Sequence, residues 1–357
     1  MFHSSGTELE GERAAFERFV AGRAIVYLDT DAWIALSKGQ DDGAKRCRQE
    51  ATDAVRKGRL IFPLSYASCS EIVQQSPGDS RTVRIRLMQE LSRGVAFRAI
   101  SAVRKIEARA ALPILLGEKP DQPDVTRIFS SIYECFSDAA ELITGIDGSE
   151  KRPDFITWLR RTSRLMSLED YVHVFDTIGG GSGSRQFFED RAQTLLDSIP
   201  RAADACRNRD GALNRDKVFL QEALSCFTSI KPMLLAALHE QRPEGMKAIA
   251  TLAQSDPGGP DRLRRLLEAM PSAANEVDLF VGRVMNPNRK HRIRNDFWDV
   301  EHAVVPAVYS NAWVTLDRGL ASLVRSCNAP QQRGCRILLG MQEFKVFLTV
   351  SEPHSNS

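Results

Sequence analysis

The sequence lacks the cysteine pairs that mark a disulfide framework or a thiolate zinc site. Its 357 residues include seven cysteines, an odd number with no CxxC pair among them. It also lacks any uncharged apolar run of about 18 residues, the length that a membrane-spanning helix needs. The first twenty residues carry acids and no apolar segment of the kind that signal peptides have. These absences predict a soluble protein with reduced thiols, located in the cytoplasm and not in a membrane.

An excess of charge of one sign is also absent. The chain has 48 basic and 46 acidic residues, a formal net charge of +2. A nucleic acid partner would therefore have to be bound by local basic patches, because the charge of the whole chain provides no attraction.

Strand-like sequence occurs mainly near the two ends of the chain. AIVYL at 24–28 and RLIFPLS from Arg59 are apolar runs of strand length, and NAWVTLD around Val314 and CRILL around Ile337 are two more. Helical patterns follow these runs. Strands that alternate with helices predict an α/β fold, a parallel β-sheet flanked by helices.

The pattern between the two ends is helical. From Arg81 to Leu112 the apolar spacing predicts two helices interrupted at Gly94, and little strand-like alternation follows until about residue 290. We therefore expect three regions. Residues 1–112 and 289–357 would form the two parts of the α/β domain, and 113–288 a large, mostly α-helical insertion.

Acidic residues stand where the predicted strands end. Asp29 and Asp31 follow the first strand, Glu71 lies on the helix after the second strand, and Asp317 ends the strand around Val314. Ligands of open parallel sheets bind beyond the carboxyl ends of the strands. We therefore expect these carboxylates to lie close together.

A second acidic pair lies in NDFWDVEHA, where Asp296 and Asp299 are three residues apart and so share one face of a helix. Several carboxylates in one place repel each other unless a cation neutralises them. Mg²⁺ or Mn²⁺ is the cofactor that suits carboxylate and water ligands. Such ions activate water for the hydrolysis of phosphate esters.

Taken in order, these motifs resemble those of the PIN-domain (PIN-like) ribonucleases. YLDTDAWIAL is similar to the first motif of that family, SYASCSEIV to the second, NDFWDVEHAVV to the third and WVTLDRGLASL to the fourth. The resemblance covers the two ends of the chain. The long middle region is a departure, because members of the family are usually single short domains.

The resemblance implies a metal-dependent nuclease, an endoribonuclease with RNA favoured over DNA as the partner, and a toxin-like role as the nearest analogy. The catalytic acids and metal ligands that it implies are Asp29, Glu71, Asp299 and Asp317, with Asp296 as a further ligand. A second copy of the chain or an inhibitory protein stays open as an additional partner.

Three more residues are candidates for supporting roles around the metal. Asp31 stands where the family often has an amide or a small polar residue. His302, three residues after Asp299, is placed to orient a carboxylate, although a satisfied half-buried histidine is an equal alternative. Glu107 is a further candidate acid, for which a salt-bridged helix residue is the alternative.

A basic run precedes the third motif and is the candidate nucleic-acid binding segment. It contains Arg289, Lys290, Arg292 and Arg294. Beside an acidic metal site, such a run would hold a phosphate backbone. The alternative is a solvated basic turn.

Two other functions stay open. LDTDAW also resembles the first motif of haloacid-dehalogenase-like phosphatases, in which Asp29 would be the nucleophile, although Trp33 stands where that motif has Thr or Val. A catalytically silent PIN-like scaffold that binds nucleic acid or protein is the third hypothesis.

Overall fold

A four-stranded parallel sheet lies at the centre of the computed structural model, in the order β2-β1-β5-β6. Its strands are β1 (Ala24–Leu28), β2 (Leu60–Ile61), β5 (Ala312–Thr315) and β6 (Arg336–Leu339). The structure describes residues 14–39, 42–132, 134–135, 167–177, 190, 193–194, 197–241, 259–286 and 293–350. The expected α/β class with a parallel sheet is confirmed. The two ends of the chain meet in this sheet, because β5 pairs with β1.

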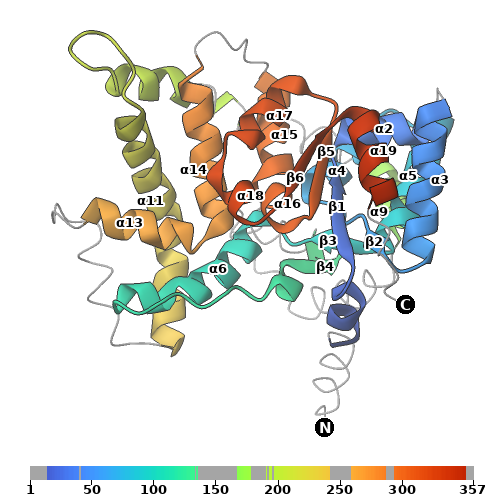
Figure 1. Ribbon diagram of the computed structural model, residues 1–357, viewed down its shortest axis with the longest axis horizontal. Coiled ribbons are helices and arrows are strands. Elements are labelled where there is room, and N and C mark those ends of the chain that lie inside the picture. Colours follow the sequence, from blue (N-terminus) through green and yellow to red (C-terminus); the bar gives the residue numbers. More distant parts are fainter. Residues whose placement is uncertain are drawn as a thin grey trace.

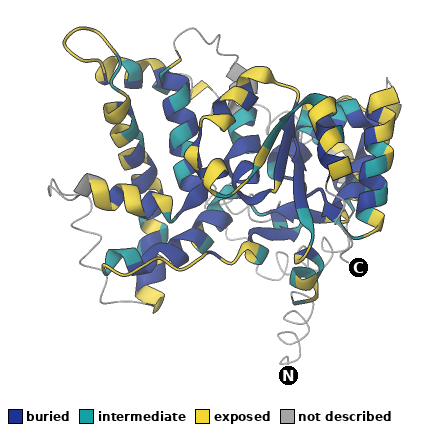
Figure 2. Ribbon diagram, in the orientation of Figure 1, coloured by how far each residue is buried: buried dark blue, intermediate teal, exposed yellow. Residues whose placement is uncertain are grey.

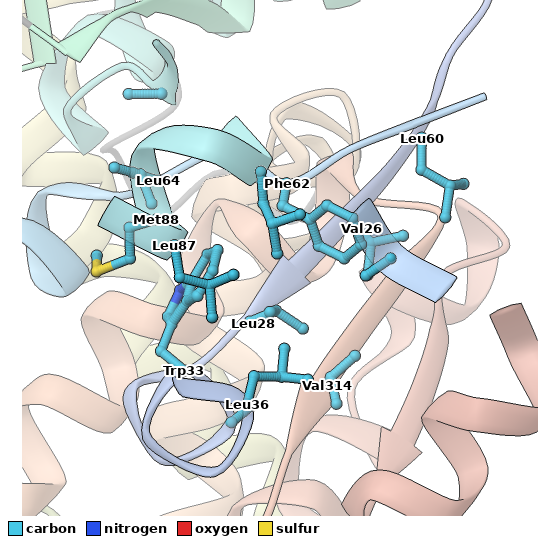
Figure 3. Packing of buried hydrophobic residues seen from close by; sticks show 14 of the residues in the cluster. Val26, Leu28, Trp33, Leu36, Leu60, Phe62, Leu64, Leu87, Met88 and Val314 are labelled. Carbon is cyan, nitrogen blue, oxygen red and sulfur yellow. The ribbon is translucent and has the colours of Figure 1, made fainter. Parts of the chain in front are cut away.

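Helices cover both faces of the sheet (Figure 1). Val26 and Leu28 of β1 belong to the hydrophobic cluster of one face, and Figure 3 shows them beside Val314. Ile25 and Tyr27 belong to the cluster of the other face, because successive side chains of a strand point to opposite sides. The first face is covered by α2 (Thr30–Lys38), α3 (Asp42–Arg56), α5 (Asp79–Ser92) and α19 (Gly340–Val350), and the second by α15 (Ile293–Val304), α16 (Pro306–Tyr309), α17 (Arg318–Arg325) and α18 (Asn328–Gln332).

A short antiparallel pair extends the strand content beyond the sequence expectation. β3 (Val95–Phe97) pairs with β4 (Phe129–Ser131), where the sequence pattern predicted helix up to Leu112 and a helical insertion after it. Leu64 binds β3 through two backbone hydrogen bonds, of 3.0 Å from its N–H to the carbonyl of Val95 and 2.7 Å from the N–H of Phe97. A strand of three residues is too short to show an alternating pattern, and this one is stabilised by its neighbours.

The helical region has a hydrophobic core of its own. It is formed by α6 (Ile100–Leu115), α11 (Arg215–Gln241), α13 (Gly259–Glu268) and α14 (Pro271–Val284), grouped on the left of Figure 1. The expected boundary at residue 112 falls inside α6. Leu279 of α14 packs in the cluster under the sheet, so that the helical region is continuous with the α/β part. Buried residues accordingly run through both parts, and exposed ones line the outer helices (Figure 2).

Three further elements complete the fold of the described residues. They are α4 (Tyr66–Val73), η1 (Val125–Ile128) and α9 (Leu168–Thr177). Within the described residues, no helix combines the length and the apolar character that crossing a bilayer requires.

The free edge of β6 is covered by an ion pair. Arg325 Nη2 donates to the carbonyl of Ile337 at 2.8 Å, and the N–H of Leu339 donates to Glu343 Oε2 at 2.8 Å. Arg325 and Glu343 also contact each other at 3.1 Å. The C=O group of Ile337 and the N–H group of Leu339 point away from β5. The pair therefore occupies groups that would otherwise be a template for another strand.

We expect Glu343→Lys to promote self-association of the protein, because it repels Arg325 and leaves the Leu339 N–H exposed. The stability cost should be below about 1 kcal/mol, as for other exposed ion pairs. Sedimentation velocity over a range of concentrations measures the effect. Glu90→Lys is the matched control, since it breaks an exposed 3.0 Å ion pair with Arg56 that joins α3 to α5 and does not involve β6. Equal association of the two variants would contradict a protective role of the pair.

Candidate active site

Two acids lie at the carboxyl ends of the central strands. Asp29 follows β1 and caps α2, and Asp317 follows β5 and caps α17. From β1 the chain crosses to β2 on one side, whereas β5 and β6 lie on the other. The strand order therefore reverses between β1 and β5, and ligands of open α/β sheets bind beyond the carboxyl ends of the strands at such a point.

Asp29 is almost completely buried, with 5% of its surface exposed, and its carboxylate is hydrogen-bonded. Its Oδ1 accepts the N–H of Ala32 at 2.8 Å, and its carboxylate accepts a hydrogen bond from Thr315. Burial raises the pKa of Asp29 from 3.8 to about 6, against the lowering effect of these two bonds. Thr315 Oγ also accepts the N–H of Asp317 at 3.0 Å. One threonine thus connects the two acids.

Glu71 reaches the same region from α4. Its Oε2 accepts a hydrogen bond from the hydroxyl of Thr30 and lies 2.8 Å from His302 Nε2. His302 is buried on α15. Burial by itself lowers the pKa of His302, but the charge and the hydrogen bond of Glu71, with the charges of Asp29 and Asp299, raise it above its ordinary value. If His302 orients a carboxylate, as the sequence suggested, that carboxylate is the one of Glu71.

Tyr27 contacts the other ring nitrogen of His302. Its hydroxyl is hydrogen-bonded to His302 Nδ1 and lies 2.7 Å from Ser65 Oγ and 3.0 Å from Ser68 Oγ. Ser65 is also the N-cap of α4. Tyr27 was not recognised in the sequence, where it is one apolar position of a strand; an aromatic hydroxyl in an otherwise aliphatic strand is the signal that was present.

Asp31 lies at the exposed side of the site. Burial raises the pKa of Asp31, and the charges of Glu71 and Asp317 raise it further, while His302 lowers it. These charges lie within electrostatic range of Asp31, since the interaction of charges decays with distance. The structure thus brings together Asp29, Asp31, Glu71, Asp317 and His302.

Asp299 faces a different partner. One of its oxygens lies 3.7 Å from Nη2 of Arg283, which is only 1% exposed on α14. Its charge also raises the pKa of His302, which places it near the site. Arg283 was missed in the sequence. A lone arginine in the apolar helix VDLFVGRVM was the available signal, because a buried arginine needs an acidic partner.

Glu107 does not take part in this arrangement. Its carboxylate accepts hydrogen bonds from the N–H of Ser272 at 2.8 Å, the hydroxyl of Ser272 at 2.7 Å and the hydroxyl of Tyr309 at 2.6 Å. These partners belong to α14 and α16. The prediction of a supporting role at the site is therefore corrected: Glu107 connects helices, and its buried oxygens are satisfied there.

The candidate nucleic-acid segment lies mostly outside the described residues. Arg289, Lys290 and Arg292 fall outside them, and the side chains of Arg294 and Asp296 are not described. The roles expected for these five residues stay predictions.

The donor set suits a hard cation in its chemistry. All the acids provide oxygen ligands, and the pKa values of Asp29 and Asp31 are raised first by burial and then by neighbouring carboxylates, Asp31 for Asp29 and Glu71 and Asp317 for Asp31. Within the part of the chain that the structure describes, no group of three or more His, Cys, Asp or Glu side chains is arranged to hold a metal ion. The described residues therefore do not form a closed metal cage, and only a hydrated Mg²⁺ or Mn²⁺ that binds one or two carboxylates and keeps its waters would suit them.

Comparison with known proteins provides no relative. No family model, no curated protein and no solved structure matches the chain. The function therefore has to be argued from the site itself.

Proposed function

We propose that this chain is a metal-dependent nuclease of the PIN-like type, most simply an endoribonuclease, which hydrolyses phosphodiester bonds with Mg²⁺ or Mn²⁺. One observation carries the proposal. Asp29 and Asp317, 288 residues apart in the sequence, follow adjacent central strands at the point where the strand order reverses, and Asp31 lies within electrostatic range of Asp29, Glu71 and Asp317. The choice of RNA rests on the sequence resemblance alone.

The surroundings of the acids support an anionic substrate. Asp29 and Asp317 cap α2 and α17, so both helices begin at the site and direct the positive ends of their dipoles towards it. Helix N-termini favour phosphate groups. A site that combines carboxylates with two helix N-termini is suited to hold a cation and a phosphate next to each other.

The acids and the groups bonded to them would have different roles in the reaction. Asp29, Asp31, Glu71 and Asp317 are the candidate ligands, of which one or two would bind the hydrated cation directly, and Asp299 is engaged by Arg283. A bound divalent ion would activate water and neutralise charge on the phosphate. The Ala32 N–H and the Thr315 hydroxyl fix the carboxylate of Asp29, so that little reorganisation is required when a cation arrives.

Incubation of the purified protein with labelled single-stranded RNA, transfer RNA and DNA tests the proposal. Cleavage is expected with Mn²⁺ and should disappear with EDTA, because the acids cannot activate water without a cation. Turnover of a small phosphomonoester with a phosphoaspartate at Asp29 would instead favour the phosphatase. Binding without cleavage under all metal conditions would favour the silent scaffold.

A further inference from the structure

A hydrogen-bonded chain of buried side chains ends on Glu71. It begins at the hydroxyls of Ser65 and Ser68, passes through Tyr27 and reaches His302. His302 Nε2 then contacts Glu71 Oε2 at 2.8 Å. Tyr27 and His302 are both almost completely buried, whereas Glu71 is partly exposed at the site. The chain therefore leads from the protein interior to one carboxylate of the site.

The hydrogens of this chain have one consistent assignment for each protonation state of His302. With neutral His302, its Nε2–H donates to Glu71, its Nδ1 accepts the O–H of Tyr27, and the phenol oxygen accepts from a serine hydroxyl. With protonated His302, Nδ1–H donates to the phenol oxygen, and Tyr27 donates to a serine. The Nε2–H donates to Glu71 in both cases. The contact with Glu71 is thus independent of the protonation state of the imidazole.

From this geometry we propose that Tyr27 and His302 are positioning residues for Glu71, which hold its Oε2 and so fix the orientation of the whole carboxylate for cation binding. The inference rests on the proposed function. A glutamate side chain has three rotatable bonds and takes many conformations unless partners hold it. Thr30 and His302 both contact the same oxygen, Oε2. Outer partners of this kind orient ligands and typically change metal affinity about 10- to 100-fold when they are removed.

The test uses Tyr27→Phe, His302→Ala and His302→Gln in the full-length protein. The glutamine amide can replace Nε2–H as the donor to Glu71, so it should restore part of what alanine loses. Tyr309→Phe is the matched control, because it removes another buried tyrosine hydroxyl that is bonded to a glutamate, Glu107, away from the site. It should cost similar stability without affecting the site.

Two readouts are measured, the affinity for Mn²⁺ by calorimetry and the crystallographic position of the Glu71 carboxylate without metal. Tyr27→Phe should weaken Mn²⁺ binding about tenfold and His302→Ala about 10- to 100-fold, with Glu71 displaced in both. Tyr309→Phe should match the wild type. If the wild-type protein neither binds Mn²⁺ nor cleaves RNA, the proposed function fails, and the position of Glu71 still decides the inference. An unmoved Glu71 in Tyr27→Phe and His302→Ala overturns it.

Discussion

Asn in place of Asp29 is expected to remove nuclease activity and to make the metal-free protein more stable. Cleavage should fall by more than about 100-fold, because even outer partners of metal ligands contribute 10- to 100-fold. The amide keeps the hydrogen bond to the Ala32 N–H, as asparagine is as good a helix cap as aspartate. The substitution should therefore lower the cleavage rate and raise the free energy of unfolding. A purely structural role of Asp29 would not produce this combination.

The stability gain follows from the raised pKa of Asp29. Burial raises it from 3.8 to about 6, so the folded protein binds the proton more tightly than the unfolded chain does. Stability from this group is fully present below pH 3.8 and is lost as the pH rises to about 6. Above that pH the buried ionised carboxylate costs roughly 3 kcal/mol. Asparagine has no charge to bury, so the variant should be more stable by about 1–3 kcal/mol at pH 7 and by little near pH 4.

Urea unfolding in EDTA at the two pH values measures this difference. Asp42→Asn is the control, since it removes one carboxylate that is largely exposed near Lys45. The control should leave both the stability and the cleavage rate nearly unchanged. Cleavage that persists in Asp29→Asn would exclude Asp29 from the reaction, and unchanged nucleic-acid affinity together with an absence of cleavage in the wild type would favour the scaffold.

The sequence predicted the central strands because their signals are local. Five consecutive apolar residues precede Asp29, and a helical pattern begins directly after it, so that strand, cap and helix are all visible within a short window. Asp317 likewise follows a strand, β5, and caps the helix that begins directly after it. The positions of Asp29 and Asp317 at the ends of β1 and β5 were therefore predictable from the local sequence, and their role in a site stays a prediction from the rule that ligands bind where parallel strands end.

Other features of the site depend on distant pairs and could not be predicted in this way. His302 and Tyr27 are 275 residues apart, and nothing in either neighbourhood indicates the other. β3 has three residues and is stabilised by Leu64 and β4, so its neighbours decide its conformation. Tertiary context overrides local propensity most easily in segments this short.

Glu107 was a candidate for the site in the sequence and has a structural role in the fold. It is completely buried and accepts three hydrogen bonds from Ser272 and Tyr309, which connects α6 to α14 and α16. Burial raises the pKa of Glu107, and the hydrogen bonds and the charge of Arg104 oppose this rise. A carboxylate in this setting is a structural connection between the helical region and the layer that supports the sheet.

Glu107→Ala is therefore expected to cause the largest loss of stability, about 3–5 kcal/mol, because it leaves a cavity and three buried donors without an acceptor. Tyr309→Phe removes only one of the three bonds and should cost about 1 kcal/mol. Urea unfolding of the two variants and the wild type measures both losses. At temperatures where the variants remain folded, their cleavage of RNA should equal that of the wild type, since Glu107 has no bond to the acids at the ends of β1 and β5. If Glu107→Ala instead kept its stability and lost activity to the extent expected for Asp29→Asn, Glu107 would belong to the site, and its position between the helices would need another explanation.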